Sequence, residues 1–357
     1  MDNIRGTALL LTNGWMDTIH AKTTHGILRG SDRFIPVAVI DPKYAGQNTE
    51  TVSGIAPPRP IFATVAEALE KLPEKPQYCV VGVATHGGIL PDSLRNEVIV
   101  ALQHGISAIS GLHSFISDDP VLVSLAEEND CILFDVRKPR DRSELRFWDG
   151  QIYAVKTPRI AILGTDCALG KRTTCKLLTY ALRRHNVKAE MIYTGQTGWM
   201  EGHPYGFIFD TTINDFISGE IERAILACEN GAHPDVMLIE GQSSLRNPSG
   251  PCGAEFLVSG NAKGVILQHA PGRKCFEGYE DLDAVIPPIE QEMELIRFYR
   301  SEVIAITLNN EGMTDAELTA YQHQTQERLG IPVVQPLKDG LDGLVPVVQD
   351  YIRKQNG

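Results

Sequence analysis

The stretch Arg159-Ile160-Ala161-Ile162-Leu163-Gly164-Thr165-Asp166-Cys167-Ala168-Leu169-Gly170-Lys171-Arg172-Thr173-Thr174 decides the fold of this chain. Its apolar run, 160–163, is typical of a buried strand, and a helix-forming run opens at Lys171 after a glycine-bounded turn. In such a turn the backbone N–H groups, the helix dipole and the Lys ammonium converge on an anion. The sequence therefore predicts a phosphate-binding loop (P-loop).

The spacing of this loop differs from the common pattern. Five residues separate Gly164 from Gly170, and Arg172 stands where a Mg²⁺-binding hydroxyl is expected, while Thr173 and Thr174 come later. An ordinary glycine-rich strand–helix turn is the plain alternative, but the flanking periodicity favours phosphate binding over it. The predicted cofactor-binding residues are Gly164, Thr165, Asp166, Cys167, Ala168, Leu169, Gly170, Lys171, Arg172, Thr173 and Thr174.

Composition limits the class of protein. A length of 357 residues accommodates two domains, and the hydrophobic and charged fractions, 43% and 22%, are those of a globular protein. The net charge of −12 argues against a nucleic-acid or anionic-membrane partner, since either needs a basic surface. The seven cysteines form no C-x-x-C pair, which indicates reduced thiols and a cytoplasmic location.

Strand-like and helix-like runs alternate along the whole chain, which predicts an α/β fold with parallel sheets. We expect a Rossmann-like N-terminal domain over 1–138, a charged and proline-rich linker over 139–157, and a P-loop domain over 158–357. Asp41 follows the second expected strand, as the ribose-binding acid of dinucleotide folds does. Only one glycine, Gly14, follows the first strand, so Asp41 is better interpreted as a cap or turn residue.

Several polar residues lie at expected strand ends, where open α/β sheets bind ligands. His86 and His113 are candidates in the first domain, with loop hydrogen bonding as the alternative. In the second domain, Gln196 and Thr197 lie in a glycine-rich stretch, 195–202, that is expected to be a loop closing on ligand. Glu240 ends the apolar run 236–240 and takes the place of the acidic Walker B residue.

The order of these motifs resembles two groups of proteins. Gly164-Thr165-Asp166 before Gly170-Lys171, then Ile239-Glu240-Gly241 and Gly330-Ile331-Pro332-Val333, is similar to the dethiobiotin synthetase branch of P-loop proteins. The resemblance extends to a two-domain P-loop family, once classed as of unknown function and typified by D-glutamate N-acetyltransferase. The further stretches that carry it are 194–198, Gln242, Leu245, 248–249, 21–23, Asp41, 87–88, 110–113 and 135–137.

This resemblance implies an N-acyltransferase that uses acetyl-CoA and a small amino acid acceptor, with the P-loop holding the cofactor phosphates. A second cation at Arg172 suits a phosphate-rich ligand that needs no catalytic Mg²⁺. Glu240 is the first candidate for the base that deprotonates the amine, and Asp166 is the second. Arg246 or Arg273 would hold a substrate carboxylate, with surface ion pairs as the alternative, and Gln242 is a further candidate for substrate binding. Departures from the family pattern at Ser243, 246–247 and 250–252 leave the acceptor open. Analogy with the branch also suggests a homo-oligomer.

Two other functions remain open at this point. In an ATP-dependent kinase or ligase, Lys171 would bind phosphate, Thr173 and Glu240 would hold Mg²⁺, and Asn309 would contact adenine. In a nucleotide-binding sensor, the P-loop would bind its ligand without turnover. The abundance of polar groups at several strand ends favours chemistry over sensing.

Overall fold

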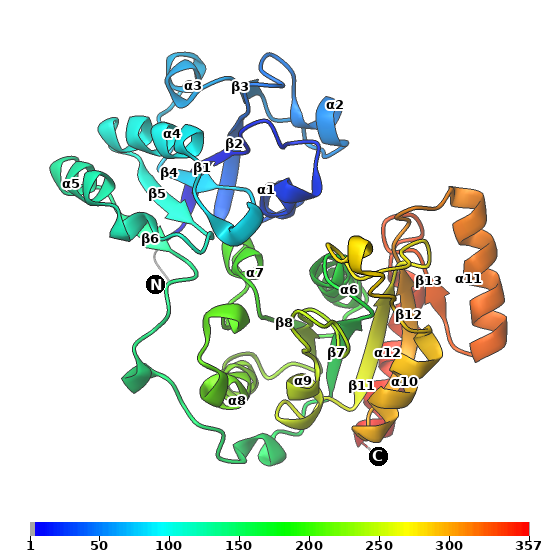
Figure 1. The fold of residues 1–357 in the computed structure, drawn as a ribbon. Coiled ribbons are helices and arrows are strands. Elements are labelled where there is room, and N and C mark those ends of the chain that lie inside the picture. Colours follow the sequence, from blue (N-terminus) through cyan, green and yellow to red (C-terminus); the bar gives the residue numbers. More distant parts are fainter. Residues whose placement is uncertain (1–3, 357) are drawn as a thin grey trace. The chain divides into compact units, whose positions relative to one another are not determined.

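The structure is a computed structural model that describes residues 4–356. The chain divides into two compact units. The Rossmann-like unit contains the chain up to Pro139 together with Gln196–Pro204, and the P-loop unit contains Arg140–Gly195 and the chain from Tyr205 onward. Each unit is a parallel sheet covered by helices, as the sequence predicts (Figure 1).

The sheet of the Rossmann-like unit has the strand order β3-β2-β1-β4-β5-β6, which is that of dinucleotide-binding folds. Its strands are β1 (Gly6–Leu11), β2 (Phe34–Ile40), β3 (Ile61–Phe62), β4 (Tyr78–Val81), β5 (Ser107–Ser110) and β6 (Leu133–Asp135). Its α-helices are α1 (Lys22–Leu28), α2 (Thr49–Ser53), α3 (Val65–Lys71), α4 (Asp92–Gln103), α5 (Pro120–Glu128) and α7 (Gln196–Glu201).

Different helices cover the two faces of this sheet. Leu9 and Leu11 point to one face, where they pack with buried residues of α3, α4 and α5. The register places the aromatic rings of Phe34, Tyr78 and Phe134 on the other face. Trp199 of α7 stacks on Phe134 there, with ring centroids 4.9 Å apart. A helix from the second half of the sequence thus completes the first unit (Figure 1).

Helix α7 corrects one expectation. The sequence predicts a ligand-closing loop over 195–202, but Gln196–Glu201 is a helix whose residues are all buried. Arg33 fixes it, since its guanidinium lies 4.0 Å from the Trp199 ring centroid and its Nε donates to the Trp199 carbonyl. Burial of Trp199 and Met200 outweighs the low helix propensity of the glycines in this stretch.

The P-loop unit has the strand order β13-β12-β11-β7-β10-β8-β9. Its strands are β7 (Arg159–Gly164), β8 (Ala189–Tyr193), β9 (Tyr205–Gly206), β10 (Val236–Glu240), β11 (Gly264–His269), β12 (Glu302–Leu308) and β13 (Val333–Val334). Its α-helices are α6 (Lys171–Arg184), α8 (Asn214–Ala232), α9 (Ala254–Val258), α10 (Ile289–Phe298), α11 (Asp315–Leu329) and α12 (Val345–Asn356). The core on one face joins β-strands to α8, α9, α10 and α11, while α6 and α12 contact the sheet and each other.

Short 3-10 turns occur in both units. They are Ile19–Ala21, His86–Gly88, Ile116–Asp118, Arg142–Glu144, Gln151–Ala154, Phe209–Thr211, Glu280–Leu282 and Asp342–Leu344. Among residues 4–356, no helix is both long enough and apolar enough to cross a bilayer.

The expected linker, 139–157, belongs to the P-loop unit from Arg140 onward, and most of its residues are exposed, as expected of a charged segment. Ile152 is fully buried in the core of that unit, and Val155 is buried beside it. The Glu222 carboxylate of α8 accepts hydrogen bonds from the Ile152 and Asp149 backbone N–H groups, at 2.9 and 3.0 Å. Two apolar anchors in a charged segment are enough to fix it on the surface of the unit.

Candidate functional site

The P-loop connects the buried central strand β7 to helix α6. The strand ends at Gly164 and the helix begins at Lys171, as the sequence predicts. Gly170 precedes the helix with a φ of 100°, a conformation that favours glycine. No side chain caps α6, and its first turn contains no acidic residue. The first-turn N–H groups of a helix have no partner within it, so this end of α6 can hold an anion.

Lys171 lies inside the loop that it belongs to. Its Nζ donates to the Asp166 carbonyl at 2.6 Å, and the residue is 6% exposed. Burial lowers the pKa of the Lys171 ammonium. A negatively charged ligand at the helix terminus would stabilise the ammonium form, which links anion binding to the protonation of this side chain.

The Asp166 carboxylate holds the P-loop to two other loops. One oxygen accepts from Asn247 Nδ2, and the other accepts from Arg273 and from the Glu277 backbone N–H, each at 2.8 Å. Asp166 is fully buried. With three donors on its carboxylate, this residue braces the loop, and its predicted role as a second base stays a prediction.

Further side chains hold the loop from neighbouring strands. Thr165 Oγ1 lies 2.9 Å from His269 Nδ1 at the end of β11, and Asn309 Nδ2, after β12, donates to the Leu169 carbonyl at 3.0 Å. Thr174 Oγ1 donates to Gln268 Oε1 at 2.6 Å. The loop is therefore preorganised by residues at the ends of β11 and β12, on one side of β7, which lowers the ordering cost of ligand binding. Asn309 has a bracing contact in addition to its predicted role with adenine.

Burial makes His269 a pH-sensitive part of this brace. Because its ring is desolvated, its pKa falls to about 4 from 6.5. The folded protein therefore binds the proton more weakly than the unfolded chain does, and its stability is complete above pH 6.5 and decreases as the pH falls towards 4.

We expect the free energy of unfolding of the P-loop unit to fall by about 3 kcal/mol between pH 6.5 and 4 through His269. Urea denaturation at several pH values measures this dependence. His269→Gln should remove this contribution to the pH dependence of stability. His104→Gln is the control and should not remove it, because His104 is exposed and bonded to the Val100 carbonyl. An unchanged pH profile in His269→Gln would contradict the assignment.

Glu240 ends β10, the strand beside β7. Its Oε2 accepts from the Thr194 backbone N–H at 2.9 Å, and its carbonyl accepts from Thr194 Oγ1 at 2.8 Å. Gln242 Nε2 donates to the same hydroxyl at 2.8 Å. Gly195 also lies at this cluster, since a Cβ placed on it would be 3.3 Å from Gln242 Nε2 and 3.6 Å from Glu240 Oε1. Glu240, Gln242 and Thr194 thus form one polar cluster at the carboxyl edge of the sheet.

The two candidate substrate arginines are paired with carboxylates in the structure. Arg246 Nε donates to Glu292 at 2.7 Å, and burial raises the pKa of Glu292, which Arg246 partly offsets. Arg273 donates through Nε to Glu311 at 3.0 Å, besides its bond to Asp166. A substrate carboxylate would have to compete with these partners.

The remaining candidates belong to the Rossmann-like unit. Thr197 Oγ1 lies 3.0 Å from Thr23 Oγ1, and Gln196 lies against Gly111 at the end of β5. The His113 backbone N–H donates to the Gly88 carbonyl, and the His113 side chain lies against the same glycine. The His86 side chain lies outside the described part of the structure. Substrate binding by these residues stays a prediction.

Asp41, also in this unit, is a turn residue. It is fully buried, and its carboxylate accepts from Thr12 Oγ1 and from the backbone N–H groups of Met16 and Lys43, at 2.7, 3.1 and 3.0 Å. With three protein donors, this carboxylate fixes the turn after β1. This role agrees with the interpretation of Asp41 as a turn residue.

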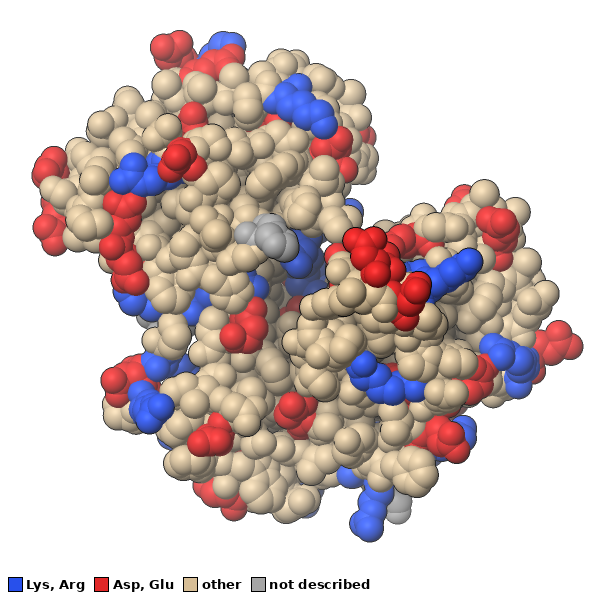
Figure 2. Space-filling model, in the orientation of Figure 1, with Lys and Arg blue, Asp and Glu red and all other residues tan. Residues whose placement is uncertain are grey.

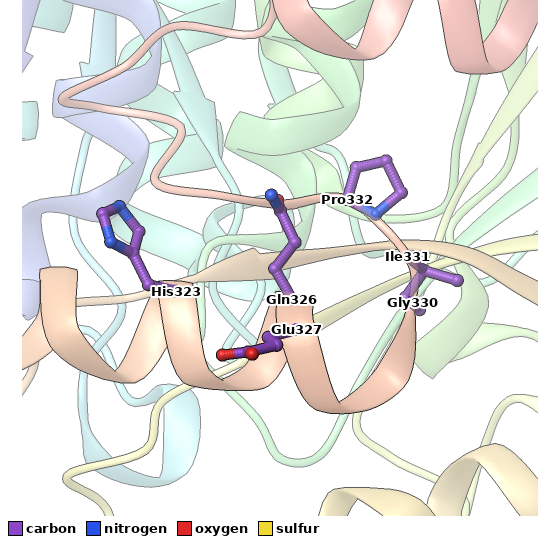
Figure 3. Close-up of a pocket in the computed structure, with 6 residues that line it drawn as sticks. All are labelled: His323, Gln326, Glu327, Gly330, Ile331 and Pro332. Atoms are coloured by element: carbon purple, nitrogen blue, oxygen red, sulfur yellow. The ribbon is translucent and has the colours of Figure 1, made fainter.

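A hollow of about 660 Å³ lies elsewhere in the P-loop unit (Figure 3). It is lined by His323, Gln326 and Glu327 of α11 and by 330–332. These last residues precede the amino end of β13, whereas the P-loop follows the carboxyl end of β7. Because the strands are parallel, the hollow and the P-loop lie at opposite edges of the sheet.

On the face in Figure 2, acidic side chains are scattered with basic ones among them.

Comparison with known proteins agrees with this architecture. A P-loop domain described as a domain of unknown function, DUF1611, matches residues 146–345, and its Rossmann-like N-terminal partner matches 42–139. The chain belongs to the DUF1611 family.

Two curated relatives are named D-glutamate N-acetyltransferase. The one from Tritonibacter scottomollicae is 32% identical over 276 residues, and the one from a Pseudoalteromonas species is 30% identical over 273. Each alignment covers 74% of this chain and 79% of the relative. The crystal structure of a DUF1611 family protein from Anabaena variabilis superposes with a TM-score of 0.86, at 28% identity, over 97% of this chain and 100% of that one.

The sequence alone did not indicate that His269, Gln268 and Asn247 belong to the site of this DUF1611 protein. His269 and Gln268 end a strand adjacent to β7, so their position was a usable signal once the strand order was known. Asn247 lies in a loop 81 residues after Asp166 in the sequence, and no local pattern indicates the hydrogen bond between them.

Proposed function

We propose that this protein is an N-acyltransferase that moves the acetyl group of acetyl-CoA to the amine of a small amino acid, D-glutamate or one like it. The observation that carries the proposal is the match to two relatives named D-glutamate N-acetyltransferase over 74% of this chain. A braced and uncapped P-loop supports it, because such a loop suits a cofactor that carries a pyrophosphate.

In this proposal the P-loop binds the cofactor and Glu240 acts on the acceptor. The substrate ammonium loses a proton to Glu240, and the free amine nitrogen attacks the thioester carbonyl carbon. The carbon–sulfur bond then breaks, the nitrogen gives up a second proton, and the departing thiolate takes up a proton to leave as the CoA thiol. Backbone N–H groups near Gly195 or Gly241 would stabilise the oxyanion. The thioester lies at the far end of the long pantetheine arm, so this mechanism requires the arm to fold back towards the carboxyl edge of β10.

Amino acid acceptors with a second carboxylate would need a cation. Arg246 and Arg273 are the candidates in the P-loop unit, with Gln242 near Glu240 as a neutral donor. To bind the substrate carboxylate, each guanidinium would have to release its protein carboxylate or bind both carboxylates at once. Such an exchange makes the binding of an acidic acceptor depend on the partners Glu292 and Glu311.

The test is an assay that offers acetyl-CoA with a panel of D- and L-amino acids and detects free thiol. We expect thiol release that depends on the enzyme and on an amino acid, with D-glutamate or a close analogue preferred, and an acetylated product in the mass spectrum. Mg²⁺-dependent ATP consumption without thiol release would replace the proposal by a kinase or ligase. Ligand binding without any turnover across the panel would replace it by a sensor.

A further inference from the structure

We propose that Arg172 replaces the divalent cation of P-loop nucleotidases, so that this loop binds a pyrophosphate diester without metal and discriminates against Mg²⁺-bound nucleoside triphosphates. The inference rests on the proposed function only in taking the P-loop as the cofactor site. It is supported by the position of Arg172 on α6 and by the hydrogen bonds that Thr174, Asp166 and Glu240 already make.

The first step is the position of Arg172 on α6. In Mg²⁺-dependent P-loop proteins, the hydroxyl residue directly after the Lys holds the metal. Helix α6 begins at Lys171, so Arg172 occupies that place on the same helical turn and has the same Cβ direction. A guanidinium is permanently charged and offers several donors to phosphate oxygens, so it can provide there the positive charge that the metal would provide.

The two threonines after Arg172 do not supply the missing hydroxyl. Thr173 is one residue later, which turns its side chain by about 100° around the helix from the metal-binding direction. Thr174 is 1% exposed, and its Oγ1 donates to Gln268 Oε1, which also accepts from Thr307 Oγ1 at 2.7 Å. Neither hydroxyl therefore takes the place of the missing ligand after Lys171.

The carboxylates near the P-loop already accept hydrogen bonds from the protein. Mg²⁺ requires oxygen ligands in near-octahedral geometry. Asp166 is fully buried and already accepts from Asn247, Arg273 and the Glu277 N–H. Glu240 accepts from the Thr194 N–H. The Asp166 carboxylate and Glu240 Oε2 thus already accept from protein donors, while Lys171 and Arg172 provide two cations in the first turn of α6.

This arrangement selects a class of ligand. A pyrophosphate diester, as in CoA, carries two negative charges, which Lys171 and Arg172 together neutralise. The triphosphate of ATP carries more charge and normally binds as its Mg²⁺ complex. That bound metal would approach the Arg172 guanidinium, and the repulsion would disfavour the complex.

The experiment is isothermal titration of the full-length protein with CoA and with ATP, each in EDTA and in MgCl₂. We expect CoA affinity to be the same in both buffers. Arg172→Thr should weaken CoA binding in EDTA by about 10–100-fold, the loss of a charge-assisted contact, and should make ATP binding depend on Mg²⁺. Arg172→Lys should retain most of the metal-free affinity.

The matched control is Arg184→Thr, because Arg184 lies on the same helix but is exposed and paired with Asp342. It should leave every affinity unchanged. Lys171→Ala shows how much affinity is lost when one positive charge of the P-loop is removed. Thermal unfolding without ligand shows that each variant is folded.

Two results would overturn the inference: wild-type CoA binding that requires Mg²⁺, or equal CoA affinity of wild type and Arg172→Thr in EDTA. Failure of the proposed function looks different. In that case CoA does not bind, but inorganic pyrophosphate or ADP binds in EDTA and loses affinity in Arg172→Thr, which supports the role of Arg172 alone.

Discussion

Glu240→Gln should lower kcat for acetyl transfer by about 10²–10⁴-fold, the contribution of a positioned general base. The amide can still accept from the Thr194 N–H, so the polar cluster at the end of β10 should persist. It cannot take a proton from the acceptor amine. Because the base acts in the chemical step, KM for acetyl-CoA should change little.

The control for this variant is Glu327→Gln, which changes a carboxylate in the hollow at the opposite edge of the sheet and should leave kcat unchanged. A Glu240→Gln enzyme with normal kcat but raised KM for acetyl-CoA would assign Glu240 to cofactor binding. That result would also indicate an extended pantetheine arm, with the acceptor away from β10.

Asp166→Ala should lower the free energy of unfolding of the P-loop unit by about 3–5 kcal/mol, the cost of breaking a buried ion pair. The change leaves Asn247 and the Glu277 N–H without their acceptor and removes one carboxylate from Arg273, whose side chain is 8% exposed. Urea denaturation followed by fluorescence measures the loss. CoA affinity should fall with it, because the loop loses its brace.

Asp342→Ala is the surface counterpart. Asp342 pairs with Arg184 and His185 at about half exposure, and its loss should leave the free energy of unfolding nearly unchanged because water screens such pairs. If Asp166→Ala were as mild as this control, the carboxylate would not brace the loop, and Asp166 would return as a candidate base.

The parts of the fold that the sequence predicts well are those with strong local patterns. The continuous apolar runs of β7 and β10 and the turn into α6 are visible because parallel central strands are buried on both faces. The place of Glu240 beside the P-loop follows from the same pattern, since both lie at carboxyl ends of neighbouring strands.

The parts that the sequence could not predict depend on distant contacts. Gly195, Gly198 and Gly202 made the stretch around them resemble a loop, whereas contacts with Arg33 and with the rings of Phe34 and Phe134 stabilise it as α7. Asp166 resembled a free acid because its partners, Asn247, Arg273 and Glu277, come from loops far along the chain. In each case tertiary packing overrides local preference.

The placement of α7 has a consequence for attempts to study either half alone. The chain passes between the units after Pro139, after Gly195 and after Pro204, so a single cut cannot separate them. A fragment from 140 onward would carry Trp199 and Met200 without the aromatic face that buries them, and the fragment 1–139 would expose that face to water. Both fragments should aggregate, whereas mixing them during refolding should restore soluble protein.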